Sequence, residues 1–495
     1  MDGTGEALAT GGRRTGIDRR AVPLLLLAVL VGARVWFGLS VPPNIDEAYY
    51  FGWGEHLQLS YLDHAPLSGW LSALGRPFGT LPVAVHLAPF VSFGLVAFAI
   101  SLLERRRGAD GVAVLWALVI WLSTPLFHAL SILNYPDHIL IGTGALAIVF
   151  FHFWIEDARP RDLFAAAFFL GLAGLSKYPA VLIGLALVLS LAMRRELRPR
   201  FRDPRLYLAG ALTLLLVSPV LIWNLTHGLA SVAFHGGERF GTAGSGLTVS
   251  GLIRLFGQML VYLSPFGLIF GLMAVWRGRR SASGTFLVSL LFLGTLPFLA
   301  LSLWAPAEGQ VQPHWLVTGL LPLMLLLPDA LTAPSRRLFR TLHVGFGVGI
   351  VGLLCLYYGT TPLLTEALNI RDREASVTYG QDQLVSAARA AAEKTGARFF
   401  AFPSYREAAK FAFELGTARP VLTLDRRPDQ YDLWQAPDAL GADTIIIVLA
   451  TLPEAVYAPA FASVEPLGEV TPTRFGRPLA TYRLVLGKGF RGQVR

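Results

Sequence analysis

Long apolar runs recur through most of this chain and restrict its fold more than any other feature. Hydrophobic residues make up 54% of the 495 residues, and charged residues only 15%. A run of about 20 apolar residues is long enough for a helix to cross the hydrocarbon core of a bilayer. We therefore predict a polytopic α-helical membrane protein. On this criterion about 11 transmembrane helices are predicted, at residues 21–40, 81–103, 111–131, 138–155, 163–176, 179–193, 206–226, 251–276, 284–304, 314–331 and 341–358.

Arginine residues lie mainly in alternate loops between these predicted spans. The arginine-rich loops include residues 105–107, 194–205 and 277–280, whereas the intervening loops carry few basic residues. By the positive-inside rule, the arginine-rich loops and the N-terminus face the cytoplasm. The abundance of arginine, alanine and glycine is typical of a GC-rich bacterial genome, so we expect a location in the bacterial inner membrane. The positive-inside rule then accounts for the net charge of +9 in a protein surrounded by membrane lipids. The basic charge is therefore no sign of a nucleic-acid partner, and we exclude one.

The composition changes along the chain and divides it into three parts. Residues 1–20 are polar and rich in glycine, and we predict a disordered cytoplasmic N-terminus. Residues 21–358 form the predicted transmembrane catalytic domain, with a large outer loop at 41–80. In residues 359–495 helical patterns such as SYREAAKFAFELG alternate with short β-prone runs such as DTIIIVLA. This alternation predicts a small α/β domain on the extracytoplasmic, periplasmic side, serving as a lid or a scaffold.

Acidic side chains gather at the predicted outer face, starting in NIDEAYYFGWGEHLQLSYLDHAPLSGW at residues 44–70. The free energy of inserting a charged side chain is about 2.5 to 3.5 kcal/mol at mid-bilayer and less near the interface. Acids beside apolar spans are therefore expected to have a structural or functional role. Asp46 can cap a helix, with Glu47 favoured by the helix dipole, and Asp137 can be a solvated turn residue. Neither role explains why several acids and histidines reach one face, namely Asp46, Asp63, Asp137, His64, His138, His235 and His314. We interpret this set as a polar chamber.

Two aromatic segments accompany the acids. Tyr49, Tyr50 and Trp53 share one face of a short helical pattern, which we predict to lie in the membrane interface. The late segment DQYDLW, residues 429–434, offers Tyr and Trp side chains that would either stack on a ligand or close a local core.

The motifs of the outer loops resemble those of the GT-C glycosyltransferases, in the branch that contains protein O-mannosyltransferases and lipid A aminoarabinose transferases. Members of that branch carry an Asp-Glu pair after the first span, here Asp46-Glu47, and a later acidic-basic-x-Pro element, here DHAP at 63–66. Further matching segments are YPDHILI, GLAGLSKYPAVL, SPVLIWNLTHGLASVAFHGGERFG and QPHW. The resemblance covers about residues 20–360. Position 64 is His where some relatives have Lys, and the interval from Asp46 to Asp63 is shorter than in the aminoarabinose enzymes.

The resemblance implies a GT-C fold and the transfer of a sugar from a polyprenyl-phosphate donor to an envelope acceptor at the periplasmic face, with inversion. The acceptor would be lipid A, another glycan, another lipid or a protein. Such a reaction needs a base for the acceptor hydroxyl and a counter-charge for the departing phosphate. We predict Asp46 as the general base and Asp137 as a second catalytic residue, which either orients the acceptor or binds the sugar and any metal. The predicted substrate-binding residues are Glu47, Tyr50, His64, Lys177, Asn224, Arg239 and His314, with Lys177 and Arg239 as phosphate clamps. Asp63, with His64 or His314, would hold a divalent cation, and a site without metal is an equal alternative.

Two other classes of function fit a chain with many spans. A flippase or carrier for a polyprenyl-linked sugar would also contain several apolar spans and buried polar groups. Such transporters more often show internal repeats and charged groups at mid-membrane, and neither is evident here. A non-catalytic envelope scaffold would use the spans as an anchor for its outer domain. These alternatives differ from a transferase in forming no glycosidic bond.

Overall fold

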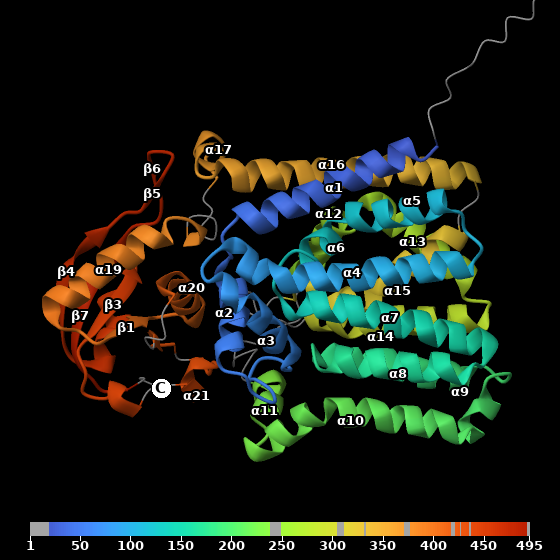
Figure 1. Ribbon diagram of the computed structural model, residues 1–495, viewed down its shortest axis with the longest axis horizontal. Helices are drawn as coiled ribbons and strands as arrows, with labels where there is room; N and C mark the ends of the chain where they lie inside the picture. The colour runs from blue at the N-terminus through green and yellow to red at the C-terminus, as the bar shows by residue number, and fades with distance from the viewer. Residues whose placement is uncertain are drawn as a thin grey trace, which may run out of the picture.

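The computed structural model describes residues 19–237, 249–303, 311–330, 333–370, 377–416, 421–425, 427–434 and 437–492. Apolar helices lie roughly side by side along most of the molecule, and an α/β layer covers one end of them (Figure 1). The predicted disordered N-terminus falls almost entirely outside the described residues.

Each predicted span coincides with one helix or with two consecutive helices. Many begin with proline in the first turn, where its missing N–H costs no helical hydrogen bond. The bundle helices are α1 (Ala21–Ser40), α4 (Pro82–Arg106), α5 (Gly111–Ser123), α6 (Pro125–Leu130), α7 (Pro136–Asp157), α8 (Pro160–Gly174), α9 (Val181–Met193), α10 (Pro204–Thr226), α12 (Val249–Tyr262), α13 (Pro265–Gly278), α14 (Ala282–Ser302), α15 (Val317–Ala330) and α16 (Ala333–Thr360).

Six of the helices in the described residues are long and apolar enough to cross a membrane alone, and up to seven spans result if a bent pair counts as one. The bent pair is α12 and α13, whose axes differ by 96°. Proline accounts for two of the interruptions, because Pro125 and Pro265 each begin a new helix within a predicted span. The chain is therefore a multi-pass membrane protein.

Helix α7 is the centre of the bundle. An 18-residue apolar stretch of this helix is 94% buried, and the helix packs against α4, α8, α9, α14 and α15. Small residues bring other helices close together. A Cβ added to Gly294 of α14 would lie 2.4 Å from the Cα of Gly319 in α15, so these two backbones touch. Close approach through small residues is a common way of packing helices in membranes.

The outer loop forms short helices at the end of the bundle, α2 (Ile45–Gly52), a 3₁₀ turn at Trp53–Glu55, and α3 (Leu67–Ser72). The aromatic side chains of α2 do not all face outward, as a helix lying in the membrane interface would require. Tyr49 and Trp53 are buried, because α20 (Tyr405–Leu415) of the C-terminal layer packs against α2. The aromatic side chains fill the contact between the loop and this layer.

The C-terminal residues form a five-stranded sheet in the order β2-β1-β3-β7-β4. Strand β1 runs parallel to β2 and β3, and β7 runs antiparallel to β3 and β4. A strand lies in each of the four β-prone runs of this region, ARFFAF, PVLTL, DTIIIVLA and LATYRLVL. The strands are β1 (Phe399–Phe402), β2 (Val421–Thr423), β3 (Thr444–Leu449), β4 (Phe461–Val470) and β7 (Tyr482–Phe490).

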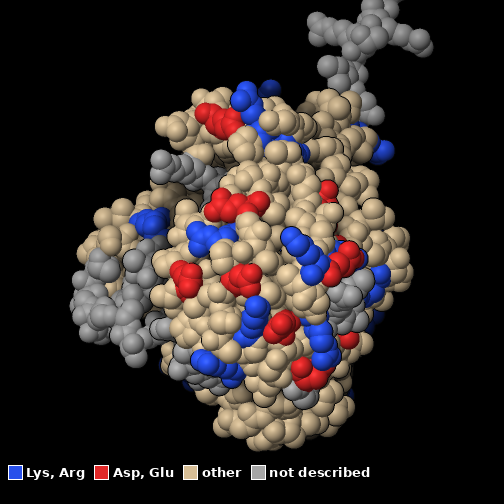
Figure 2. Space-filling view, turned by 90° about the vertical axis from the view of Figure 1, so that its left-hand side faces the viewer, with Lys and Arg blue, Asp and Glu red and all other residues tan. Residues whose placement is uncertain are grey.

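Helix α20 connects this sheet to the rest of the molecule. Phe411 points into the core between the sheet and α19 (Gln381–Thr395), whereas Ala409 and Phe413 pack on the aromatic residues of α2. An amphipathic pattern with apolar residues on two faces gives one helix two partners. The end of the molecule that carries the layer shows charged side chains of both signs scattered over its surface (Figure 2).

Candidate active site

A cavity of about 720 Å³ lies where the outer loop, the bundle and the C-terminal layer meet. The outer loop contributes Asp46, Tyr50, Asp63 and His64 to its wall. Helix α6 contributes apolar side chains, and the segment before α15 contributes His314 and Trp315. The C-terminal layer contributes a polar wall, formed by Ser404, Tyr405, Arg406, Asp425 and Arg427.

Asp46 occupies the first turn of α2, but it does not cap that helix. The cap is Asn44, whose Oδ1 accepts from the backbone N–H groups of Asp46 and Glu47 at 3.0 and 2.9 Å. The Asp46 carboxylate instead accepts two hydrogen bonds from Arg406, 2.7 Å from Nε and 2.9 Å from Nη2. Both side chains are about one third exposed, at 31% and 34%. The predicted base is thus in the cavity wall and held by an arginine from another part of the chain.

Asp63 joins three parts of the molecule. Its carboxylate accepts a hydrogen bond from the hydroxyl of Tyr49, and Nη2 of Arg427 lies 3.5 Å from Oδ1. Its backbone carbonyl lies 2.7 Å from Nε2 of His235 in α11 (Ala230–Gly236). Burial and the charge of Asp63 raise the pKa of Tyr49 well above its usual value, so this hydroxyl remains a donor.

These contacts do not suit the cation predicted at Asp63. A guanidinium lies beside the carboxylate that would bind the metal, and like charges repel. Within the described part of the chain, no group of three or more His, Cys, Asp or Glu side chains is arranged to hold a metal ion. We therefore derive no step through a metal at Asp63.

Aromatic rings line the cavity beside Asp46. Ring centres of Tyr50 and His64 are 5.8 Å apart, those of Tyr50 and Tyr135 are 6.0 Å apart, and those of Tyr135 and His314 are 6.4 Å apart. This curved series suits the apolar faces of a sugar ring, while the imidazole nitrogens can bond to hydroxyl groups. Tyr50, His64 and His314, which are all predicted to bind substrate, therefore lie in one wall of the cavity.

Glu47 differs from its predicted role. It is 1% exposed and does not belong to the cavity wall. Its carboxylate accepts from the backbone N–H of Asn44 at 3.0 Å and from that of Asn134 at 2.9 Å, and Nε2 of His86 lies 3.2 Å away. Glu47 thus completes a capping box and fixes α2 against the start of α7.

Asp137 and Lys177 form an ion pair with each other. Lys177 Nζ lies 2.7 and 2.9 Å from the two carboxylate oxygens of Asp137, and both residues are buried. Tyr135, two residues before Asp137, lines the cavity, whereas the carboxylate of Asp137 contacts Lys177. Neither Asp137 nor Lys177 is among the residues that line the cavity beside Asp46, and the roles predicted for them stay predictions.

Asn224 is also not among the residues that line the cavity. Asn224 donates to the carbonyl of Val220 at 3.0 Å and accepts from the N–H of Ser231 at 3.2 Å, which ties α10 to α11. Arg239 lies outside the described residues.

The segment DQYDLW closes a core. Gln430 Oε1 accepts from the N–H of Leu62 at 2.8 Å, Tyr431 stacks on Tyr49, and Trp434 stacks on His56. Asp429 is 1% exposed, and burial together with the charge of Asp432 raises the pKa of its carboxyl to about 8. Of the two predicted roles for this segment, the structural one is found.

Sequence reasoning missed Arg406 and Arg427, the two arginines of the C-terminal layer that face the outer loop. Arg406 follows Ser404 at the start of α20, a helix start that the sequence shows clearly. The pairing of Arg406 with Asp46 spans 360 residues of chain, so no local pattern could reveal it.

Comparisons with known proteins agree with this architecture. Residues 63–223 match the family model of dolichyl-phosphate-mannose-protein mannosyltransferases. The chain is 24% identical over 279 residues to the lipid A galacturonosyltransferase RgtD of Rhizobium johnstonii, covering 56% of this chain and 58% of that protein. It is 26% identical over 362 residues to the lipopolysaccharide core galacturonosyltransferase RgtB of the same organism, covering 67% and 69%.

Solved structures show the same fold. The crystal structure of ArnT from Cupriavidus metallidurans in the apo state superposes with a TM-score of 0.61 at 16% identity, over 93% of this chain and 98% of that one. ArnT bound to undecaprenyl phosphate superposes with a TM-score of 0.59 over the same shares. These similarities show that the chain shares the fold of ArnT, and the family model and the two relatives agree with the resemblance seen in its sequence.

Proposed function

We propose that this protein transfers a sugar from a polyprenyl-phosphate donor to a glycolipid acceptor of the bacterial envelope. The observation that carries the proposal is the cavity in which Asp46 faces substrate space and is held by Arg406. The similarity to RgtD and RgtB favours lipid A or the lipopolysaccharide core as the acceptor. The undecaprenyl phosphate bound to ArnT favours a polyprenyl carrier.

We further propose the topology that this chemistry requires. The eleven predicted spans include the shorter helices such as α5 and α9, the N-terminus faces the cytoplasm, and the region from about residue 359 forms a periplasmic domain. The arginine-rich loops between helices support this orientation through the positive-inside rule. The cavity would then open near the periplasmic surface of the bilayer, where envelope glycolipids are available.

In the proposed mechanism, the donor phosphate competes with Asp46 for Arg406. A guanidinium binds phosphate oxygens in a bidentate manner, as it binds the carboxylate here. Once released, Asp46 accepts the proton of the acceptor hydroxyl, and the acceptor oxygen forms a bond to the anomeric carbon. The bond from that carbon to the phosphate oxygen breaks, and its electron pair leaves with the polyprenyl phosphate. Arg406 neutralises this anion, so we assign that role to Arg406 and not to a cation at Asp63.

In this proposal, the other walls of the cavity contact different parts of the substrate. Leu126, Leu130 and Leu133 on or near α6 form an apolar side suited to the first isoprene units of the donor. The aromatic side with Tyr50 and His314 would contact the sugar. Attack from the side opposite the phosphate would invert the anomeric centre.

Mass spectrometry of envelope glycolipids tests the proposal. A deletion strain should lack one sugar on an envelope glycolipid, and purified protein in proteoliposomes should restore it when given that glycolipid and the lipid fraction that contains the donor. A flippase would change the glycolipids of the strain without forming a glycosidic bond in the purified system. An unchanged glycolipid profile in the deletion strain would contradict the proposal.

A further inference from the structure

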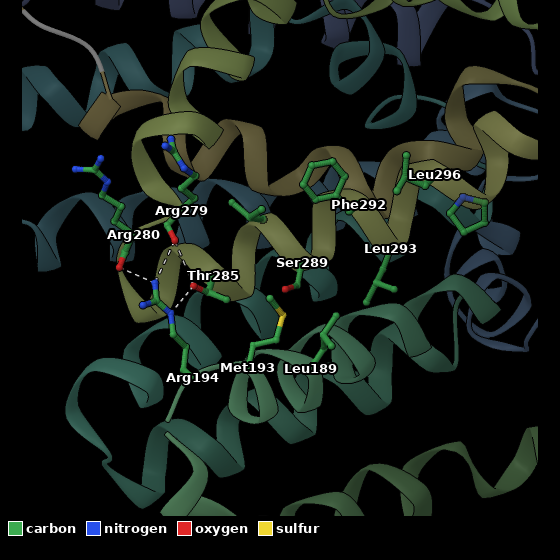
Figure 3. A pocket seen from close by; sticks show the side chains of 12 residues that line it. Leu189, Met193, Arg194, Arg279, Arg280, Thr285, Ser289, Phe292, Leu293 and Leu296 are labelled. Atoms are coloured by element: carbon green, nitrogen blue, oxygen red, sulfur yellow. Dashed lines mark hydrogen bonds between the residues drawn. The ribbon is translucent and has the colours of Figure 1, made fainter. Parts of the chain in front are cut away.

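A second large hollow lies at the opposite end of the bundle from the C-terminal layer. This groove has a volume of about 1010 Å³ and runs between α9 and α14. Met193 ends α9 at this position, and the turn from α13 to α14 contributes Arg279 and Arg280. Figure 3 shows the arginines gathered at one end of the groove and apolar side chains along the rest.

The polar end is positively charged. Arg194 donates to the carbonyls of Arg279 and Ser281 at 3.1 and 2.8 Å and to Thr285 Oγ1 at 2.7 Å, which fixes the turn between the two helices. Glu196 is its acidic neighbour, at 3.7 Å. The described residues of the lining include three arginines and no acid. The guanidinium of Arg279 stacks on Trp276, beside Arg280, and the net positive charge attracts an anion to this end of the groove.

The rest of the groove is apolar and open to the side. Met193, Phe292 and Leu296 are 59%, 49% and 52% exposed, although each is a large apolar side chain. From Thr285 to Leu296 the groove follows α14 for about 16 Å at 1.5 Å per residue. That length is close to the hydrocarbon thickness of one leaflet, which is about half of the 30 Å hydrocarbon core.

We propose that this groove binds one anionic phospholipid of the leaflet on the arginine-rich side. Its phosphate contacts the side chains of Arg279 and Arg280, and one acyl chain lies along α14 between Met193 and Leu296. The combination of a cationic end with an apolar channel one leaflet long selects an anionic phospholipid over a neutral one. This site is separate from the proposed sugar-transfer cavity and does not depend on that function.

Native mass spectrometry of the full-length protein in detergent tests the site, with phosphatidylglycerol and phosphatidylcholine of the same acyl chains as probes. Arg279→Ala/Arg280→Ala should weaken phosphatidylglycerol binding about 25-fold, because each arginine near a membrane surface contributes about a fivefold factor. The matched control is Arg161→Ala, since Arg161 lies in the first turn of α8 with a side chain 76% exposed. Its phosphatidylglycerol binding should equal that of the wild type.

A second variant keeps the arginines and fills the channel. Ser289 is buried and lines the groove, so Ser289→Trp should displace the acyl chain and weaken phosphatidylglycerol binding at least tenfold. A thermal unfolding curve confirms that each variant is folded. The proposal is wrong if the two phospholipids bind equally to the wild type. It is also wrong if the folded double arginine variant binds phosphatidylglycerol as the wild type does, or if undecaprenyl phosphate alone shows the arginine dependence.

Discussion

Replacement of Arg406 by glutamine separates the two roles that this arginine has in the proposed mechanism. In the free protein it holds Asp46 through two hydrogen bonds of 2.7 and 2.9 Å. During turnover it would hold the phosphate of the donor and then of the departing carrier. Arg406→Gln removes the positive charge and retains a side chain that can still donate one hydrogen bond.

The expected magnitudes follow from the exposure of the pair. Because both side chains are about one third exposed, the ion pair should contribute only about 0.2 to 1 kcal/mol to folding. A hydrogen bond to a charged group contributes about 1.5 to 3 kcal/mol. Binding of a phosphate must first break the pair with Asp46, so the net loss in Arg406→Gln is about 1 to 2 kcal/mol, or roughly a 5- to 30-fold higher Kd.

Two assays measure these effects on purified protein. Native mass spectrometry with undecaprenyl phosphate gives the Kd, and thermal unfolding in the same detergent gives the stability. The Kd should rise by the stated factor, and sugar transfer should fall on the order of 100-fold, since the developing charge on the phosphate loses its partner. The melting temperature should fall by only a few degrees.

Arg398 offers a matched control on the same layer. It pairs with Asp438 at 2.7 Å on the surface, with a side chain 64% exposed and outside the cavity wall. Arg398→Gln should leave carrier binding and transfer unchanged. If Arg406→Gln binds undecaprenyl phosphate as tightly as Arg398→Gln does, the assignment of the phosphate to Arg406 is refuted.

Two further predictions concern groups that the structure buries. Lys177→Met leaves the carboxylate of Asp137 buried without its partner, so unfolding in detergent should show a loss of about 3 to 5 kcal/mol, and the double variant Lys177→Met/Asp137→Asn should recover most of it. A single variant as stable as the wild type would contradict a buried charged pair. Asp429 has a pKa raised from 3.8 to about 8, so between these values the folded protein keeps a proton that the unfolded chain has lost. Stability should therefore fall as the pH rises from about 4 to about 8, and Asp429→Asn should show a flatter dependence of melting temperature on pH over that range. Parallel curves for variant and wild type would show that Asp429 does not titrate as expected.

The helices of this fold can be predicted from sequence because their signals are local. Hydropathy locates all eleven predicted ranges on helices, and the alternation of helix and strand in the C-terminal region matches the observed sheet. The number of spans is harder to predict, because Pro125 and Pro265 divide apolar runs into pieces too short to cross a bilayer alone. A hydropathy pattern does not show which pieces stack end to end.

The candidate site is only partly readable from sequence. Asp46, Tyr50, His64 and His314 all reach the cavity wall, as an outer cluster of polar residues predicts. Glu47 is adjacent to Asp46, but its side chain turns inward and forms a capping box. This orientation also depends on a hydrogen bond from the backbone N–H of Asn134, which belongs to a distant segment.

Long-range pairing explains the other differences from the sequence prediction. Asp137 and Lys177 are both polar residues at span ends, and each finds its counter-charge in the other across 40 residues. Arg406 belongs to a helix that reads as part of a soluble domain, and only tertiary packing of α20 on α2 brings it to Asp46.

The role of Asp46 as the base is the central claim, and Asp46→Asn tests it most directly through two measurements on one sample. The amide keeps the size of the side chain, frees Arg406 from its ion pair and cannot accept the proton of the hydroxyl. Undecaprenyl phosphate should therefore bind as tightly as to the wild type or up to about fivefold tighter, while sugar transfer should fall by about 10²- to 10⁴-fold. Transfer at the wild-type rate, or a loss of transfer matched by an equal loss of carrier binding, would contradict the account.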